Sequence, residues 1–405
     1  MASPGWSQDL RSEQQEERFI MAVLTSTPED VSQRDLPSQR YPRKILNASL
    51  PPVHLDPISS EFVASKHLAF QPPSKIISLA DIHLPDSEIS PVASSVPFPL
   101  LSAEAIKQHR KELFSKDVLD NCTFATRPGS VQLRGMAPRY APFVHQFWNS
   151  SEVLGIISNI AGVDLVPVMD YEICHTNVQL GPGGMDAVRN TPIWPPAATE
   201  EEKKSFTKNS TREEEVSKPI VPWHRDSHPF VCVVMLSNTD FMTDGETELM
   251  KGDGSTIKVR SPECGHAVVL QGRSVSHIAI PAGNMPERIT IVTSFRPRDP
   301  VLQDSSSNMN VRNKSLLPEL NYQWTTYRLE LLSERFRALA SDMTKDYQSK
   351  IKDTDCEGKA GACKVETVNV EKLSRWMESQ ISYMEKTLYE MRPVTVDDWV
   401  SKNEV

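Results

Sequence analysis

The stretch that decides the fold is VPWHRDSHPFVCVVML, residues 221–236, where His224 and Asp226 stand two positions apart just before an apolar run. The run from Phe230 to Leu236 is rich in Val and predicts a buried β-strand, and the prolines around the polar residues oppose a helix. In an extended backbone, side chains at positions i and i+2 point to the same side. An imidazole and a carboxylate can therefore reach one cation from the end of this strand.

A third ligand is offered by His277, in the segment SVSHIAIP that begins at Ser274. This histidine lies on another predicted strand. Two imidazoles and one carboxylate that leave the opposite side of a cation open form the ligand set of the non-heme Fe(II) oxygenases. The sequence therefore predicts a metal site of His224, Asp226 and His277, although a His-x-Asp pair by itself is a weak signal.

Arg288 begins the strand-like segment RITIVTSF and shares one face of it with Thr290. An Arg fork beside a hydroxyl group suits a carboxylate, and a buried Arg without an anion is strongly disfavoured. We therefore expect Arg288, helped by Thr290, to bind a carboxylate-bearing ligand. Arg273 and Arg296 are alternative anion partners that the spacing leaves open.

Composition excludes several classes of function. Of the 405 residues, 39% are hydrophobic and 24% charged, and no run approaches the 18 or so apolar residues of a membrane span. The net charge of -9 opposes binding to a polyphosphate backbone, so we expect no nucleic-acid partner. Six scattered cysteines and an N-terminus without the apolar core of a signal peptide predict reduced thiols and a cytoplasmic location.

The chain divides into four predicted parts. Residues 1–45 form a polar, proline-punctuated arm that we expect to be mobile, and residues 46–164 form helical and loop support. Residues 165–300 hold short strands between Gly, Asp, Asn and Pro turns, which is typical of a barrel or sandwich. A polar insertion at 192–218 interrupts this core as a lid or a disordered loop.

Residues 301–405 are predicted to form C-terminal helices over about 322–347 and 370–391 that pack on the core. Their aromatic and aliphatic positions favour core packing, with homodimerisation as the alternative. A β core with helices before and after it is α+β by pattern.

Four further residues are predicted to line a substrate pocket. Trp223 stands beside His224, and Tyr171, His175 and Asn177 lie in the segment 171–180, which we expect to be a strand. Alternation places those three on one face, and a face that mixes polar and apolar groups suits a small-molecule pocket.

These segments together resemble a known superfamily. They are HRDSHPFV from His224, DGET from Asp244, GHAVVLQGR from Gly265, His277, and ERITIVTSFRP from Glu287. Over residues 165–300 they resemble the Fe(II)/2-oxoglutarate-dependent dioxygenases, and more narrowly a group of fungal enzymes, several of them in secondary metabolism.

The resemblance implies a double-stranded β-helix core, a jelly roll of the cupin kind, with flanking helices. It makes His224, Asp226 and His277 the Fe(II) ligands. Arg288, with Thr290, would then grip the distal carboxylate of 2-oxoglutarate.

The implied reaction oxidises a small organic molecule with O2 and 2-oxoglutarate and releases succinate and CO2. Some relatives oxidise free amino acids, and one closes valine to an aziridine, so an amino acid is a candidate substrate. Two alternatives stay open within the same fold. One is a protein hydroxylase whose insertion at 192–218 docks a polypeptide, and the other is a metal-binding jelly-roll module without turnover.

Overall fold

The computed structural model describes residues 61–394, apart from 128–129, 181–182, 202–203, 205–221, 260–261, 355–356, 358–360 and 362. Residues Val53–Val405 form one compact unit. The expected arm 1–45 and residues 205–218 of the insertion lie outside the described residues.

Short helices and strands alternate in the first part of the described chain, strands dominate the middle and long helices follow. The helices are α4 (Ala64–His67), α5 (Ala103–Leu113), α6 (Lys116–Asn121), α7 (Pro142–Asn149), α8 (Ser151–Ala161), α9 (Gly184–Arg189), α11 (Leu317–Thr354) and α12 (Val370–Tyr389), with 3-10 turns η1 (Ala80–Ile82), η2 (Asp170–Glu172) and η3 (Arg312–Lys314). The strands are β1 (Ile76–Ser78), β2 (Val92–Ser95), β3 (Phe98–Pro99), β4 (Thr123–Arg127), β5 (Ser130–Leu133), β6 (Leu165–Pro167), β7 (His175–Leu180), β8 (Phe230–Met235), β9 (Thr243–Asp244), β10 (Thr247–Met250), β11 (Thr256–Val259), β12 (His266–Leu270), β13 (His277–Ala279), β14 (Ala282–Gly283) and β15 (Glu287–Pro297).

The strands form a large antiparallel sheet and two small ones. The large sheet runs in the order β1-β2-β12-β8-β15-β7-β5-β4, with β3 and β6 paired at its margins. A separate sheet has the order β11-β10-β13, and β14 pairs with β9. This antiparallel architecture with flanking helices confirms the predicted α+β class.

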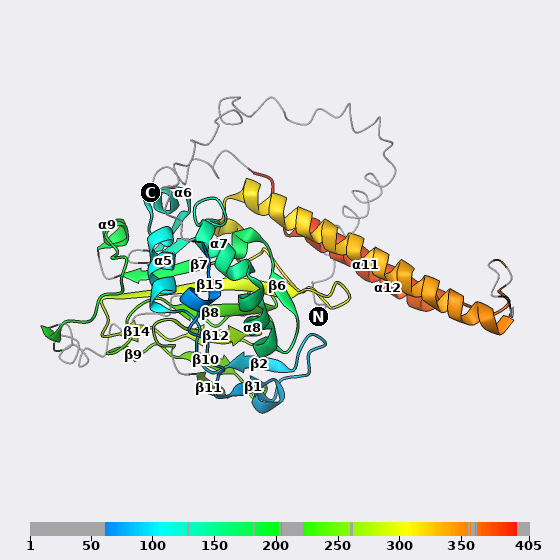
Figure 1. The fold of residues 1–405 in the computed structure, drawn as a ribbon, viewed down its shortest axis with the longest axis horizontal. Helices are drawn as coiled ribbons and strands as arrows, with labels where there is room; N and C mark the ends of the chain where they lie inside the picture. Colours follow the sequence, from blue (N-terminus) through cyan, green and yellow to red (C-terminus); the bar gives the residue numbers. More distant parts are fainter. Residues whose placement is uncertain are drawn as a thin grey trace, which may run out of the picture. The chain divides into compact units, whose positions relative to one another are not determined.

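The two faces of the large sheet differ in what they contact. On β15, Arg288, Thr290, Val292 and Ser294 line a cavity, while the alternate residues Ile289, Ile291 and Phe295 belong to the largest apolar core. That core includes residues of α5, α7 and α8, which lie over the long strands in Figure 1. The period of two along β15 thus separates a helix-covered core face from a cavity face.

Several elements match the sequence prediction. α5 begins after Ser102, whose hydroxyl accepts the Ala105 N–H at 3.2 Å. α8 spans Ser151–Ala161 and ends at Gly162, whose φ of 69° is left-handed. Both ends follow from ordinary capping chemistry, a side-chain oxygen at the start and a glycine at the end.

The segment 46–164 differs from the prediction of helices and loops, because β1 to β5 lie within it. β2 has the sequence VASS and is buried at every position, so it lacks the alternation that marks a half-buried strand. β5 joins the sheet by pairing with β7, for example Val131 opposite Val178. Such long-range pairing leaves no local pattern from which a strand could be predicted.

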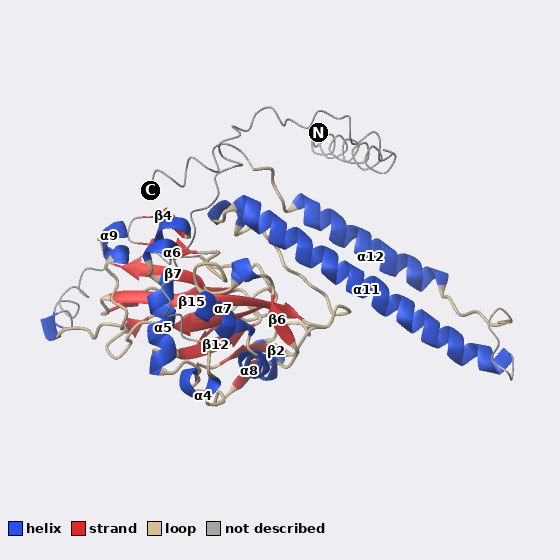
Figure 2. Ribbon diagram, turned by 45° about the horizontal axis from the view of Figure 1, so that its top comes forward, coloured by secondary structure: helices blue, strands red, loops and turns tan. Residues whose placement is uncertain are grey.

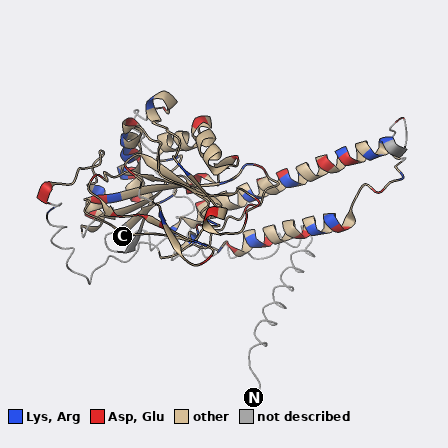
Figure 3. Ribbon diagram, turned by 90° about the horizontal axis from the view of Figure 1, so that it is seen from below, with Lys and Arg blue, Asp and Glu red and all other residues tan. Residues whose placement is uncertain are grey.

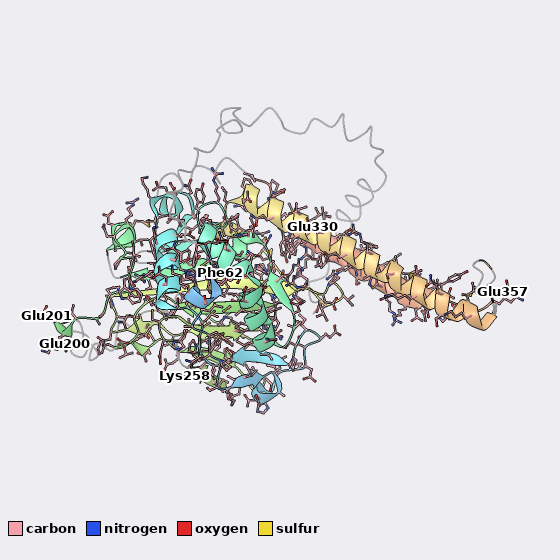
Figure 4. The ribbon with its side chains drawn as sticks, in the orientation of Figure 1. Phe62, Glu200, Glu201, Lys258, Glu330 and Glu357 are labelled. Carbon is pink, nitrogen blue, oxygen red and sulfur yellow. The ribbon has the colours of Figure 1, made fainter. Side chains whose placement is uncertain are left out.

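The C-terminal helices α11 and α12 form a long antiparallel hairpin (Figures 1 and 2). Phe336 of α11 and Trp376 of α12 pack edge to face with ring centroids 5.1 Å apart. Lys, Arg, Asp and Glu are interspersed along both helices (Figure 3), and exposed side chains such as Glu330 project around the hairpin (Figure 4). None of the helices in the described part of the chain combines the length and apolar character of a membrane span. Homodimerisation stays a prediction.

A buried ion pair joins the base of this hairpin to the loop after β15. The Arg328 guanidinium is fully buried, lies 3.6 Å from Asp304 Oδ2, and stacks on the ring of Tyr383 at 3.6 Å from its centroid. Asp304 also accepts hydrogen bonds from the hydroxyl groups of Tyr327 and Tyr383. Burial alone would raise the pKa of Asp304, but Arg328 and the hydrogen bonds from Ser306 and Tyr383 hold it below its ordinary value.

Replacing Asp304 by Ala should lower the free energy of unfolding by about 3–5 kcal/mol, because Arg328 would stay buried without its anion. Urea titration measures this loss. The exposed pair Asp342–Lys345 provides the control, and Asp342→Ala should cost less than about 1 kcal/mol. Since the pKa of Asp304 is lowered on folding, its contribution is present above the unfolded-state pKa and is lost as the pH falls through the folded-state pKa. Equal losses for the two variants would contradict this account.

Candidate metal centre

Main-chain hydrogen bonds bring the three predicted metal ligands together. The His224 N–H donates to the His277 carbonyl at 3.0 Å, and the His277 N–H donates back at 2.9 Å. The Asp226 N–H donates to the Gly272 carbonyl at 2.9 Å. His277 is also paired with Leu249 of β10. The backbone ladder therefore fixes the positions of the ligands across two chain segments that lie far apart in sequence.

Asp226 lies between the two imidazoles. Its Oδ1 is 3.6 Å from His224 Nε2, and its Oδ2 is 3.6 Å from His277 Nε2. The potential ligand atoms of the three side chains all lie within 4.8 Å of one another. Two nitrogens and a carboxylate oxygen converge on one point, as a metal ion requires.

The environment of each ligand fits a bound cation. His224 Nδ1 lies 2.8 Å from the Pro222 carbonyl, and His277 Nδ1 lies 3.0 Å from the Val275 carbonyl. A carbonyl only accepts, so each Nδ1 carries the proton and each Nε2 presents a lone pair to the site. Asp226 Oδ2 is buried and has no hydrogen-bond partner among the described residues. A buried carboxylate oxygen without a donor is costly unless a cation occupies the site.

The carboxylate is held in its charged form. Burial would raise the pKa of Asp226, but the imidazoles of His277 and His224 bring it below its ordinary value. Burial would likewise lower the pKa of His224, and Asp226 raises it. The carboxylate of Asp226 therefore favours a positive charge between itself and the two imidazoles. A divalent cation would supply this charge in place of the proton that the imidazoles otherwise attract.

The ligands line a cavity of about 240 Å³ between the large sheet and the β11-β10-β13 sheet. Its aliphatic walls come from both sheets, and its polar walls come mainly from the segment 224–228, β15 and β7, with Lys314 of η3. The lining includes Gln132, Glu172, His175, Asn177, Val231, Val233, Leu249, Val268, Arg288, Thr290, Val292 and Lys314.

Arg288 is the arginine of the three candidates that faces this cavity. Its Nε is buried without a hydrogen-bond partner in the described part of the chain, and burial alone lowers its pKa to about 10. Arg273 and Arg296 are absent from the described lining. Arg273 approaches the Asp226 carbonyl at 3.5 Å, and Arg296 stacks on Tyr327 at 5.5 Å from the ring centroid. A guanidinium directed into a cavity without an anion marks an anion-binding position.

The four predicted pocket residues divide into two pairs. His175 and Asn177 line the cavity from β7. Trp223 is outside the lining, with 38% of its surface exposed. Tyr171 lies in η2 and packs with Trp324 in a separate cluster, where its hydroxyl accepts the Leu316 N–H.

The strand predicted over 171–180 therefore starts too early. Cys174 has a left-handed φ of 62°, and β7 begins only at His175. A left-handed residue breaks the alternation of side chains, so Tyr171 does not share the face of His175. The sequence carries no strong signal for this break, because Cys seldom adopts that conformation.

A buried charged pair beside the cavity was not predicted from the sequence. Arg134, which follows β5, is hydrogen-bonded to Glu172 and lies 2.9 Å from His175 Nδ1 through its Nη1. Burial would raise the pKa of Glu172, but Arg134 holds it at about 2. Burial and then Arg134 lower the pKa of His175 to about 3, so His175 is neutral. Arg134 follows β5, a strand that was not predicted, and no local pattern links it to the segment that holds Glu172 and His175.

Comparisons with known proteins gave weak similarities. No family model matches the chain, and no curated protein matches it. Among solved structures, a prolyl-4-hydroxylase from Pseudomonas putida is 19% identical with a TM-score of 0.29, covering 49% of this chain and 89% of its own. An oxidoreductase of the 2OG-Fe(II) oxygenase family from Burkholderia pseudomallei is 11% identical with a TM-score of 0.28, covering 44% and 74%. A dioxygenase for auxin oxidation in rice is 14% identical with a TM-score of 0.27, covering 49% and 70%. Such scores do not establish a family, so function has to be inferred from the side chains of the site.

Gly272 is expected to be essential for the metal centre. A Cβ at this position would lie 1.9 Å from Asp226 Oδ2, so Gly272→Ala should displace the carboxylate. We expect the affinity for Mn(II) to fall at least ten-fold while the circular dichroism spectrum is retained. Gly155 on α8 is the matched control, because a Cβ there meets nothing within 4 Å. Wild-type Mn(II) affinity in Gly272→Ala would contradict the assignment of Asp226 as a ligand.

Proposed function

We propose that the protein is an Fe(II)- and 2-oxoglutarate-dependent oxygenase that oxidises a small organic molecule. The observation that carries the proposal is the convergence of His224, Asp226 and His277, with both Nε2 atoms directed inward, in the same cavity as Arg288. Three protein ligands on one side of a cation leave the other positions open to a chelating cosubstrate and to O2. The two antiparallel sheets that enclose the cavity support a double-stranded β-helix of the jelly-roll kind.

Each residue has a defined role in this proposal. His224, Asp226 and His277 hold Fe(II), and the Pro222 and Val275 carbonyls orient the two imidazoles. Arg288 and Thr290 bind the distal carboxylate of 2-oxoglutarate from neighbouring inward positions of β15. When bound, the iron and 2-oxoglutarate supply the oxidising power from O2, with succinate and CO2 as co-products.

The remaining walls exclude water and position the substrate. Val231, Val233 and Val268 come from the large sheet, and Leu249 comes from the facing sheet. These aliphatic side chains give a low-dielectric surface around the metal, which strengthens the interactions of the charged groups inside. His175 is neutral and Asn177 is an amide, so both offer hydrogen bonds without net charge.

A cavity of about 240 Å³ between two sheets favours a small molecule over a folded polypeptide as the substrate. A free amino acid such as valine, ring closure to an aziridine and a place in fungal secondary metabolism remain predictions from the resemblance. The protein hydroxylase and the metal-binding module without turnover remain the alternatives.

Anaerobic addition of Fe(II) and 2-oxoglutarate should produce the weak visible charge-transfer band of the chelate. Asp226→Ala should abolish both this band and O2-dependent succinate formation, because one metal ligand is lost. Absorption spectroscopy and succinate quantification test the two outcomes separately. A band without any succinate formation across a broad substrate panel would favour the module without turnover. Full turnover by Asp226→Ala would refute the ligand assignment.

Replacing Arg288 by Ala should weaken 2-oxoglutarate binding by about 1.5–3 kcal/mol, or roughly ten- to 150-fold in Kd, the scale of a hydrogen bond to a charged group. Isothermal titration with Mn(II) in place of iron measures this Kd without turnover. Arg298→Ala is the control, since Arg298 follows β15 but pairs with Asp164 at an exposed position. An unchanged Kd in Arg288→Ala would mean that another group binds the cosubstrate.

A further inference from the structure

A second cation without an ion pair among the described residues lines the cavity. Lys314 is the last residue of η3, in the segment that links β15 to α11, and it is part of the cavity wall. Burial and the charge of Arg134 lower its pKa, and no described carboxylate counteracts them. A Lys directed into a cavity without an anionic partner is a position that a ligand would complete.

Lys314 and Arg288 lie on different walls. Lys314 contributes, after burial and Arg134, to the low pKa of His175, and it also acts with burial against protonation of His224. The pKa of Arg288, by contrast, is lowered by burial alone. Lys314 stands on η3 and Arg288 on β15, and both line the cavity that His175 and His224 also line.

The charges of the described cavity lining leave Lys314 without a counterion even when the cosubstrate is bound. The carboxylates of the described lining are Asp226 and Glu172, and Glu172 is paired with Arg134. With Fe(II) bound, the metal and Asp226 together carry one positive charge, which along with Arg288 balances the 2-oxoglutarate dianion. Arg225 also reaches the cavity, but it is exposed and solvated. Within this described lining, Lys314 stays uncompensated.

The segment that carries Lys314 is held in place on two sides. The Ser307 N–H donates to the Ser227 carbonyl at 2.7 Å, which ties it to the His224–Asp226 strand end. The Asn308 N–H donates to Glu390 Oε2 at 2.6 Å, which ties it to the end of α12. The Lys314 N–H donates to the Val311 carbonyl at 2.9 Å. The main chain at Lys314 is thus held before any ligand arrives, which lowers the entropic cost of binding.

We propose that Lys314 binds a carboxylate of the substrate, so that the protein oxidises a small carboxylic acid. The inference rests on the proposed function for the role of the neighbouring metal. Lys314 anchors the acid group beside His175 and Asn177, and the aliphatic walls of both sheets receive the rest of the molecule. An anchored carboxylate fixes which carbon of the substrate faces the metal ligands.

The test uses the full chain loaded with Mn(II) and saturated with N-oxalylglycine, a non-reacting analogue of 2-oxoglutarate that fills the Arg288 site. Isothermal titration then measures the Kd of hexanoate and phenylacetate against their neutral amides, hexanamide and phenylacetamide. We expect at least one acid to bind the wild-type protein about ten-fold or more tightly than its amide. The preference should vanish in Lys314→Gln and persist in Lys314→Arg. Lys345→Gln, at an exposed position of α11, should leave it unchanged.

Two results would overturn the proposal. One is a wild-type protein that binds no acid in preference to its amide, or a preference that survives in Lys314→Gln. The other is a loss of N-oxalylglycine affinity in Lys314→Gln as large as in Arg288→Gln, which would place Lys314 in the cosubstrate site. Failure of the proposed function gives a different result. N-oxalylglycine would then bind the wild-type protein no more tightly than it binds Arg288→Gln, or would not bind at all. The acid and amide titrations with Mn(II) alone would still report on Lys314.

Discussion

The candidate site depends on buried charged groups that face the cavity and have atoms without a hydrogen-bond partner among the residues that the structure describes. Asp226 Oδ2 and Arg288 Nε are buried there without a hydrogen bond. Leaving such groups unpaired costs free energy. Asp226 is held by its main-chain hydrogen bond to Gly272 and by the absence of a side chain there, and Arg288 is held by the pairing of β15 with β7. A cation and an anion from outside the chain would satisfy both groups.

Buried charged residues with a structural role differ from those of the cavity because each has an ion-pair partner of opposite charge. Arg110 and Glu287, Arg134 and Glu172, and Arg328 and Asp304 form buried ion pairs. Arg288 follows Glu287 directly, yet alternation on β15 sends Glu287 to the helix-covered face and Arg288 to the cavity. The same residue types therefore stabilise the fold on one face and remain available to ligands on the other.

The helical hairpin is connected to the site through a short chain of contacts. Glu390 at the end of α12 accepts the Asn308 N–H, and the neighbouring Ser307 N–H donates to the Ser227 carbonyl beside Asp226. The loop that carries Lys314 is thereby fixed between the metal-binding segment and the hairpin. A cavity wall built on two anchored points keeps its side chains in place better than a free loop.

The sequence alone predicted the three candidate metal ligands that the structure brings together, the face shared by Arg288 and Thr290, the caps of α5 and α8 and the α+β class. These features depend on the period of two along a strand and on capping chemistry, which act within a few residues. Only the tertiary structure decided that Arg288, not Arg273 or Arg296, faces the cavity, that Tyr171 leaves it, and that Lys314 enters it from beyond the β core. These outcomes depend on a left-handed Cys174 and on contacts between segments distant in sequence, which leave no local pattern.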